Sequence, residues 1–217
     1  MMELVPIAYF RSPLPEKFGC PRQSGLAPGL EGRIVLEKPY DVQEALRGLE
    51  GFDYLWLIWG FSANHPTENW SPTVRPPRLG GNERLGVFAT RSPYRPNPLG
   101  LSSVRVGGIA DGEITVYGAD LMDGTPIYDI KPYIPYTDSH PDAAAGFVDT
   151  HPWKPLNVIV PDGITLPPGA MDVLRQDPRP PYHDDPLRRY GLSFSGCEIR
   201  FRVEGGTLFV ESVCASR

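Results

Sequence analysis

Proline and glycine interrupt this chain so often that their spacing limits which folds it can adopt. There are 26 prolines and 23 glycines among 217 residues. Proline fixes φ and lacks a backbone N–H, and glycine favours turns, so the segments between them are too short for long helices. These segments are largely apolar, and apolar residues make up 41% of the sequence, which is enough for a core. The pattern predicts a mainly β fold of short strands joined by tight turns.

Alternating or continuously apolar runs predict the individual strands. We expect strands at residues 4–10, 32–39, 53–61, 85–90, 101–109, 113–121, 156–160, 192–203 and 207–213. The run 53–61 is apolar at almost every position, which predicts burial on both faces. Asp111-Gly112 predicts a hairpin turn.

Helices are expected to be few and short. Residues 41–49 are predicted as the one clear helix, because Asp41 and Glu44 have the spacing of a capping box. A second short helix is expected near 168–176. We divide the chain into a main β unit, 1–140, and a small α+β C-terminal domain, 150–217, that ends in a β-hairpin.

Several classes of protein are disfavoured. No apolar run is long enough to span a bilayer. The first residues include Glu3 and no basic n-region, so we predict a cytoplasmic protein without a secretory signal. The three cysteines lack CxxC spacing and the histidines lack ligand spacing, which argues against a disulfide scaffold or a metal site.

Charge is unevenly distributed along the chain. The net charge is −5, which argues against broad non-specific binding of nucleic acid. Residues 75–105 nevertheless contain six arginines and one acid, whereas residues 106–150 contain eight acids and one lysine. A local basic face on an acidic protein suits a specifically recognised anionic partner. The alternative is that these arginines only pair with the nearby acids.

The segment 86–106 is the first candidate for a binding site. No GxGxxG, GxxxxGK[ST], GxSxG or HExxH motif occurs, so a Rossmann-type cofactor site is improbable. Prolines 93, 96 and 98 make residues 91–100 a stiff connection. Such a loop can present Arg91, Arg95 and Asn97 to a carboxylate, a phosphate or an amide edge. The alternative is a structural proline loop with solvated arginines.

The segment 120–139 is the second candidate. The Asp123-Gly124 turn would expose backbone amides and a carboxylate at a strand end. Acidic, basic and aromatic side chains then recur along an extended segment, which suggests that they line one side of a binding site. These residues are Asp129, Lys131, Tyr133, Tyr136 and Asp138. The alternative is a strand in which Asp129 pairs with Lys131 or with nearby arginines.

At these segments the sequence resembles a known family. FGCPRQSGL, GLEGFDYLWLI, TVRPPRLGG, GVFATRSPYRPNPLGLS and DLMDGTPIYDIKPYIPY together resemble the TsaA-like family. The resemblance runs from about Ile7 to Tyr136 and returns at QDPRPPY (176–182). It implies a compact β-barrel that binds S-adenosylmethionine in a non-Rossmann site and works as a homodimer. It also implies methylation of N6 of threonylcarbamoyladenosine at position 37 of tRNA.

The matching motifs also imply which residues bind the cofactor. These are Ser24, Gly25, Leu26, Ser62, Ala63, Arg95, Val104, Arg105, Leu121, Met122, Asp123 and Gly124. The chain departs from the family at Ser62-Ala63, where His-Gln is usual. His65 is a candidate to take over that contact.

The implied reaction needs a general base, because N6 of a carbamoylated adenine is conjugated to a carbonyl and is a poor nucleophile. Asp129 and Asp138 are candidates for this base, with Tyr40 or Tyr136 as orienting groups. Contacts with the tRNA anticodon loop are expected from Arg75, Arg78, Arg84, Arg91, Asn97 and Lys131. Tyr94 or Trp70 would support stacking with splayed bases. The competing hypotheses are a non-catalytic β-barrel that binds S-adenosylmethionine or RNA, and a different substrate on the same scaffold.

Overall fold

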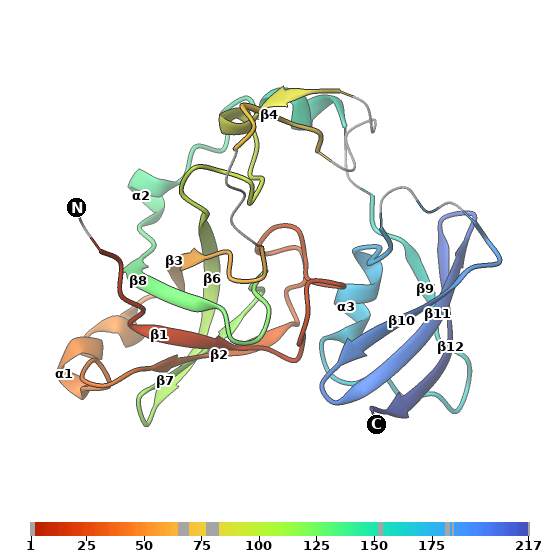
Figure 1. Cartoon of the computed structure of the whole chain (residues 1–217). Coiled ribbons are helices and arrows are strands. Elements are labelled where there is room, and N and C mark those ends of the chain that lie inside the picture. Colours follow the sequence, from red (N-terminus) through yellow and green to blue (C-terminus); the bar gives the residue numbers. More distant parts are fainter. Residues whose placement is uncertain are drawn as a thin grey trace.

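The computed structural model describes residues 3–64, 70–76, 83–151, 154–180, 183 and 185–216, and the statements below concern these residues. Six antiparallel strands close into a barrel in the order β1-β2-β7-β6-β3-β8 (Figure 1). Their bounds are β1 Ala8–Arg11, β2 Glu31–Leu36, β3 Tyr54–Gly60, β6 Leu99–Ala110, β7 Glu113–Tyr117 and β8 Pro126–Pro132. The prediction of a mainly β fold with a compact barrel is confirmed.

The barrel core is made by the inward-facing row of each strand. Phe10, Ile34, Leu55 and Ile114 are almost completely buried inside it. Burial in β3 alternates along the strand, so the expectation that 53–61 is buried on both faces is wrong. A barrel strand has only one face inside, and apolar residues on the other face lie on the outer surface.

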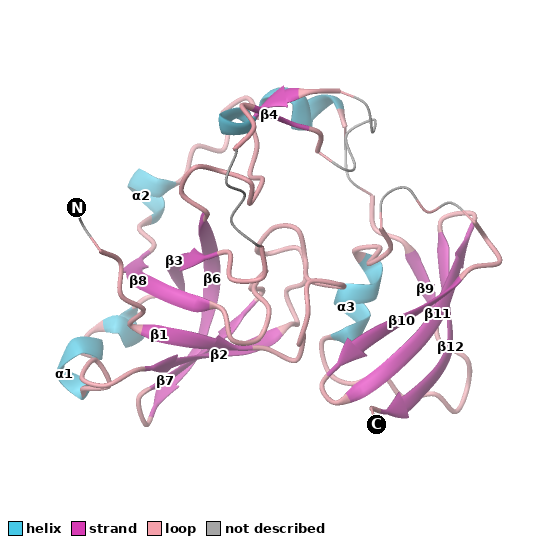
Figure 2. Ribbon diagram, viewed as in Figure 1, coloured by secondary structure: helices cyan, strands magenta, loops and turns pink. Residues whose placement is uncertain are grey.

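The helices are short and lie outside the barrel (Figure 2). They are α1 Gln43–Leu46, α2 Pro135–Asp138 and α3 Ala170–Arg175, with 3-10 turns η1 Leu49–Gly51, η2 Val87–Ala89 and η3 Gly146–Thr150. The predicted capping box at Asp41 and Glu44 is wrong: Val42 occupies the N-cap position without a side-chain hydrogen bond. The helix also stops early, because Gly48 adopts a left-handed φ of 88° that no helical residue adopts.

The hairpin at Asp111-Gly112 is confirmed. Ala110 pairs with Glu113, and the two turn residues have φ values of 51° and 75°, as a two-residue turn requires. The predicted strand 85–90 is largely wrong. Only β5, Leu85–Gly86, is a strand; it pairs with β4, Thr73–Val74, and η2 follows it.

A second sheet forms the C-terminal part of the chain. It has the order β10-β11-β12-β9 and the bounds β9 Asn157–Ile159, β10 Arg189–Phe194, β11 Cys197–Glu204 and β12 Thr207–Ala215. The segment 192–203, expected as one strand, contains a hairpin turn at Ser195-Gly196. The turn at Gly205-Gly206 is confirmed.

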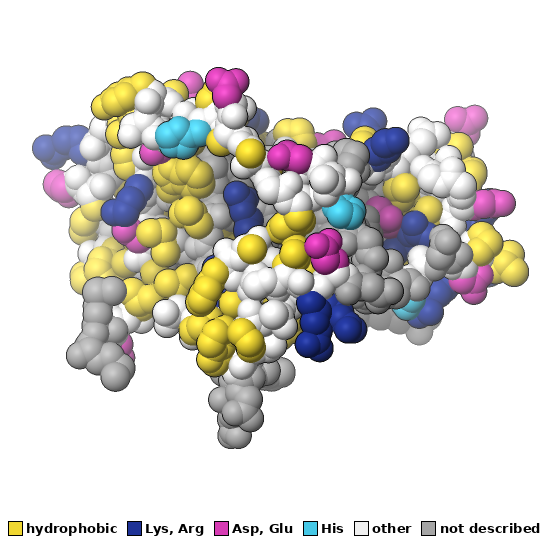
Figure 3. Space-filling model, turned by 90° about the horizontal axis from the view of Figure 1, so that it is seen from above, with side chains coloured by type: hydrophobic (Ala, Val, Ile, Leu, Met, Phe, Trp, Pro, Cys, Tyr) yellow, Lys and Arg dark blue, Asp and Glu magenta, His cyan; other side chains and the backbone are white. Residues whose placement is uncertain are grey.

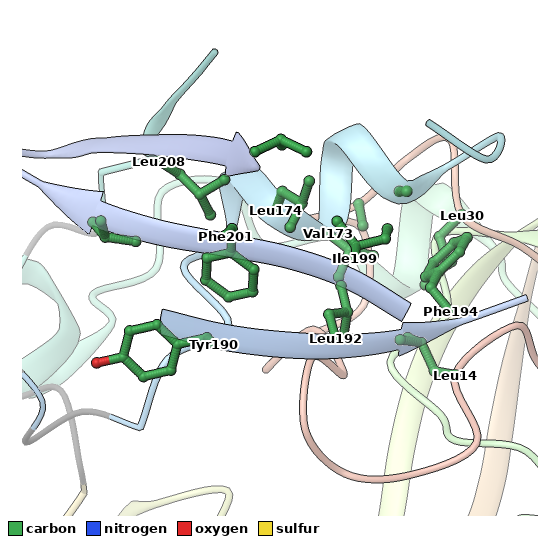
Figure 4. Packing of buried hydrophobic residues seen from close by; sticks show 14 residues of the cluster. Leu14, Leu30, Val173, Leu174, Tyr190, Leu192, Phe194, Ile199, Phe201 and Leu208 are labelled. Carbon is green, nitrogen blue, oxygen red and sulfur yellow. The ribbon is translucent and has the colours of Figure 1, made fainter. Parts of the chain in front are cut away.

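The loop 12–30, between β1 and β2, joins the two parts. Leu14, Ala27 and Leu30 of this loop are buried in the core of the C-terminal sheet. Figure 4 shows Leu14 and Leu30 beside Phe194 of β10. In Figure 1 the loop lies between the barrel and α3. The C-terminal sheet therefore shares part of its core with a loop of the barrel. None of the helices that the structure describes is long and apolar enough to cross a membrane.

Candidate functional site

Four connecting segments meet at one end of the barrel, which we call the loop end. They are residues 12–30, 61–64, 91–98 and 118–125. Backbone hydrogen bonds join them in pairs: Gly25 N–H donates to Gly118 O at 2.8 Å, and Phe61 N–H donates to Pro98 O at 3.0 Å. Most of the residues that the resemblance assigns to the cofactor lie on these segments, although the sequence separates them by up to 100 positions.

The turn at Asp123 holds the start of the loop 12–30. Ser12 N–H donates to Asp123 Oδ1 at 3.0 Å, and Asp123 N–H donates to Leu14 O at 2.8 Å. Gly124 has a φ of 74°, and its N–H donates to Phe10 O at 2.8 Å. One oxygen of the predicted ligand Asp123 is thus already engaged within the protein.

A polar network at the loop end centres on Asp120, which the sequence did not identify as a site residue. Trp59 Nε1 donates to Ser102 Oγ at 2.9 Å, and Ser102 Oγ donates to Asp120 Oδ1 at 2.5 Å. The backbone N–H of Ser24 donates to the same carboxylate. The network therefore links β3, β6, the 118–125 segment and the predicted cofactor loop. Ser102 is on the inward-facing row of β6 between Gly100 and Val104, and this alternation was the one sequence signal for a buried polar group.

Burial controls the protonation of this network. It raises the pKa of Asp120, and the bond from Ser102 and the charge of Arg91 partly oppose that rise. Burial, followed by the negative charge of Asp120, also raises the pKa of Cys20 to about 12. The Cys20 thiol is therefore neutral at physiological pH and unsuited to nucleophilic chemistry.

A groove opens beside the loop end, with a volume of about 550 Å³. This size is typical of small-molecule sites. It brings together Ser62, predicted for the cofactor, and Asn97, predicted for the substrate. A Cβ at Gly60 would lie 2.8 Å from the Tyr128 hydroxyl, so glycine is needed for Tyr128 to line the groove. The lining residues are Leu4, Gly60, Phe61, Ser62, Asn97, Pro98, Leu99, Pro126 and Tyr128.

Some predicted cofactor residues do not expose their side chains at the loop end. Val104 is fully buried in the barrel core, opposite Leu55, and Leu121 is only 1% exposed. The guanidinium of Arg105 lies 4.4 Å from the centre of the Tyr117 ring. In this structure the side chains of Val104 and Leu121 cannot reach a ligand outside the core.

Two of the predicted catalytic residues, Asp138 and Tyr40, lie beyond strand ends opposite the loop end, whereas Asp129 lies in the middle of β8. Asp129 makes an ion pair of 2.9 Å with Lys131. This is the pairing that the alternative interpretation of the segment 120–139 predicted. Asp138 Oδ2 accepts hydrogen bonds from Ile134 N–H and Trp56 Nε1, both at 2.9 Å, and these bonds lower its pKa. A lowered pKa makes a carboxylate a weaker base. Tyr40 follows β2 at the opposite end of the barrel.

The basic residues of 75–105 are not neutralised by the acids around them. Arg75, Arg84, Arg91 and Arg95 have no carboxylate within 4 Å among the described residues. Arg91 instead donates to Gln23 Oε1, and Arg95 Nη1 donates to Thr90 O at 2.8 Å. The alternative that these arginines only pair with acids fails for these four. Arg78 and His65 lie outside the described residues.

The QDPRPPY segment fastens the C-terminal part to the predicted cofactor loop. Gln176 is buried, and its Nε2 donates to Leu26 O at 2.6 Å. On α3, Asp172 Oδ2 accepts from Gly29 N–H at 2.7 Å. Sequence patterns predicted no role for this segment, because Gln176 lies 150 residues from its partner Leu26.

We compared the sequence and the fold of the chain with those of known proteins. Residues 9–139 match the model of the tRNA-methyltransferase O N-terminal domain, and residues 170–216 match that of the TrmO C-terminal domain. The chain is 42% identical over 217 residues to a tRNA (adenine(37)-N6)-methyltransferase of Escherichia coli K12, with 91% of each chain covered. It is 44% identical over 211 residues to a putative S-adenosylmethionine-dependent methyltransferase, RcsF, of Pseudomonas aeruginosa PAO1, with 90% of each covered. The crystal structure of TrmO from Pseudomonas aeruginosa superposes with a TM-score of 0.81 at 33% identity, covering 99% of each chain.

Proposed function

The chain belongs to the tRNA-methyltransferase O family, and we propose on that basis that it is an S-adenosylmethionine-dependent tRNA (adenine(37)-N6)-methyltransferase. The observation that carries this proposal is the similarity to the Escherichia coli enzyme over 91% of both chains. The loop end then serves as the cofactor site. We further propose that the adenine acted on is threonylcarbamoyladenosine, as the TsaA-like motifs imply.

The residues at the loop end fit a cofactor that is both polar and apolar. The groove beside the 118–125 segment offers the polar side chains of Ser62, Asn97 and Tyr128, and apolar residues such as Phe61 and Leu99 line the rest of it. S-adenosylmethionine supplies the methyl group when it is bound. The protein holds the acceptor nitrogen in line with that group and keeps water away, and such positioning provides much of the acceleration in group transfer.

We propose that the protein works as a homodimer. Apolar side chains lie on the outer face of β3 and β6, where Tyr54, Leu99 and Leu101 are exposed and Trp56 and Ile58 are half-buried. An exposed apolar patch of this kind suits a protein interface. The candidate base Asp138 and the orienting Tyr40 lie at the end of the barrel opposite the loop end, and the candidate base Asp129 lies in the middle of β8. In a dimer they would act on the site of the partner subunit.

The proposed tRNA substrate suggests which residues contact it. Arg75, Arg84, Arg91 and Asn97 face the tRNA, and Arg78 and Lys131 stay candidates for the same role. We propose a cytoplasmic location, which is compatible with a tRNA substrate. The rival function, a module that binds S-adenosylmethionine without chemistry, predicts cofactor binding without methyl transfer.

The decisive experiment measures the modified nucleoside in tRNA. In a strain from which the gene is deleted, nucleoside mass spectrometry should show loss of N6-methylated threonylcarbamoyladenosine, and the plasmid-borne gene should restore it. Calorimetry on the purified protein tests S-adenosylmethionine binding separately. An unchanged nucleoside peak in the deletion strain would refute the proposed substrate. Cofactor binding without methyl transfer to tRNA from that strain would favour the rival function.

A further inference from the structure

Three exposed aromatic side chains lie beside the loop end, where the packing of the chain does not require them. Phe88 is 72% exposed, Tyr94 is 54% exposed and Trp70 is 48% exposed. In η2, Val87 faces the interior and is 1% exposed, while the adjacent Phe88 faces solvent. Phenylalanine is usually buried, so this exposure indicates a surface used for contact.

The rings are arranged for stacking and are flanked by a fixed cation. The Trp70 and Phe88 ring centres are 6.2 Å apart with an angle of 35° between their planes. The Arg95 guanidinium lies 5.9 Å from the centre of the Phe88 ring. Because Arg95 also donates to Thr90 O at 2.8 Å, the position of this cation is set by the backbone.

Two arginines near the aromatic cluster, Arg75 and Arg84, form no ion pair with any residue that the structure describes. Thr73 pairs with Gly86 and Val74 with Leu85, so Arg75 and Arg84 leave the β4–β5 ribbon opposite one another. Both are exposed, and no carboxylate of the described residues lies within 4 Å of either. Like charges opposite one another destabilise a ribbon, and an anion between them would relieve this repulsion. Figure 3 looks down on this side of the molecule, where hydrophobic side chains are contiguous and basic ones stand among them.

The cluster is connected to the cofactor site. Arg91, three residues after Phe88, donates to Gln23 Oε1, and Gln23 precedes Ser24 of the predicted cofactor loop. Arg95, whose guanidinium lies over the Phe88 ring, is two residues from Asn97 of the groove lining, so an RNA chain that lies across the aromatic rings can continue to the groove.

We propose that Phe88, Trp70 and Tyr94 are a stacking platform for unpaired bases of the tRNA anticodon loop next to the methylated adenine. Arg75 and Arg84 bind the backbone phosphates of the same loop. This inference rests on the proposed function. Aromatic rings flanked by arginines are the usual means of binding single-stranded RNA, whereas a duplex offers no splayed bases. The net charge of −5 agrees with recognition by stacking and a few local cations rather than by a broad basic surface.

The test is a comparison of Phe88→Ala, Phe88→Trp and Arg75→Gln. Phe88→Ala should raise the KM for tRNA about 5- to 150-fold, since loss of stacking on one base has an effect of this size. Phe88→Trp should restore the parent KM, because it keeps an aromatic ring. Arg75→Gln should reduce the slope of log affinity against log salt by about 0.7. Val42→Ala, an exposed apolar residue at the far end of the barrel, serves as the matched control and should change neither value.

Two further measurements separate the possible failures. Binding of a fluorescent anticodon stem-loop RNA is followed by anisotropy, so the platform is tested even if the parent protein transfers no methyl group. Binding of S-adenosylmethionine is followed by calorimetry and should be equal in all variants. An unchanged RNA affinity in Phe88→Ala overturns the platform, and so does an equal loss of RNA and cofactor affinity. An inactive parent protein overturns the proposed function instead.

Discussion

Asp120 shows how a single residue can connect distant parts of a site. Its carboxylate accepts hydrogen bonds from Ser102 of β6 and from the backbone of Ser24, and Ser102 in turn accepts from Trp59 of β3. The charge of Arg91 acts on this carboxylate and lowers its pKa, and the carboxylate in turn raises the pKa of Cys20. A charged group in this position has an electrostatic cost, because burial disfavours the ionised form.

The substitution Asp120→Asn tests this cost through the pH dependence of stability. Burial raises the pKa of Asp120 above its ordinary 3.8, so the folded protein binds this proton more tightly than the unfolded chain does. The carboxyl therefore stabilises the fold below pH 3.8, and that contribution is lost as the pH rises through the folded-state pKa. The Asn variant has no such loss. Its Tm should equal the wild-type Tm at low pH and exceed it at pH 7.

Thermal melts from pH 3.5 to 8 measure this difference. A Tm deficit in the variant that is the same at every pH would show that Asp120 contributes only its hydrogen bonds. Ser102→Ala is the control, because it removes one hydrogen bond without removing the titrating group.

Strand β6 shows how an element of the barrel depends on the absence of a side chain. Gly100 lies on the inward-facing row, and a Cβ there would come within 2.2 Å of the Trp59 ring. The same ring donates to Ser102, so the indole cannot move aside without losing its hydrogen bond. Glycine at position 100 therefore sets the distance between β3 and β6 beside the loop end.

Gly100→Ala should lower the free energy of unfolding by about 1–3 kcal/mol, the usual effect of overpacking a core. Gly108→Ala is the matched control, because Gly108 lies on the same strand and a Cβ there would meet no atom within 4 Å. Urea denaturation of both variants gives the comparison. Equal stability of the two variants would show that the indole has room to relax.

At the scale of the whole molecule, the loop 12–30 is held from both sides. Asp123 and Gly118 bind it to the barrel, and Gln176 and Asp172 bind it to the C-terminal part. Leu14, fully buried in the C-terminal core, places the loop inside a second hydrophobic cluster. The C-terminal part thus supports the predicted cofactor loop mechanically, and the proposed dimer would complete the site on the side of the groove.

The proposed dimer is tested by substituting its apolar face. Leu101 on the outer face of β6 is 59% exposed, and Leu101→Glu should place a charge in the interface. Light scattering should give twice 24.0 kDa for the parent chain and 24.0 kDa for this variant, with an unchanged Tm. Leu187→Glu, at an exposed position of the C-terminal part, should stay dimeric. A parent mass of 24.0 kDa would refute the dimer.

Local patterns in the sequence predicted most strands but fewer of their boundaries. The Asp111-Gly112 turn and β3 were predictable because turn chemistry and apolar runs depend on adjacent residues. The helix at 41–49 was predicted too long, because the left-handed conformation of Gly48 outweighed the apolar spacing around it. The run at 85–90 became a 3-10 turn that exposes Phe88, which no local pattern indicated.

The spacing of prolines and glycines was enough to predict the β class of the fold, and the motifs in the loop-end segments were enough to predict the family. Which residues meet at the loop end follows from the packing of the barrel and the C-terminal sheet. Asp120, Ser102 and Gln176 act through partners 18 to 150 positions away. Such contacts depend on barrel register and on the docking of the C-terminal sheet. The physical reason is that turns and strand propensities are set by neighbouring residues, whereas hydrogen bonds in a site depend on how distant segments pack.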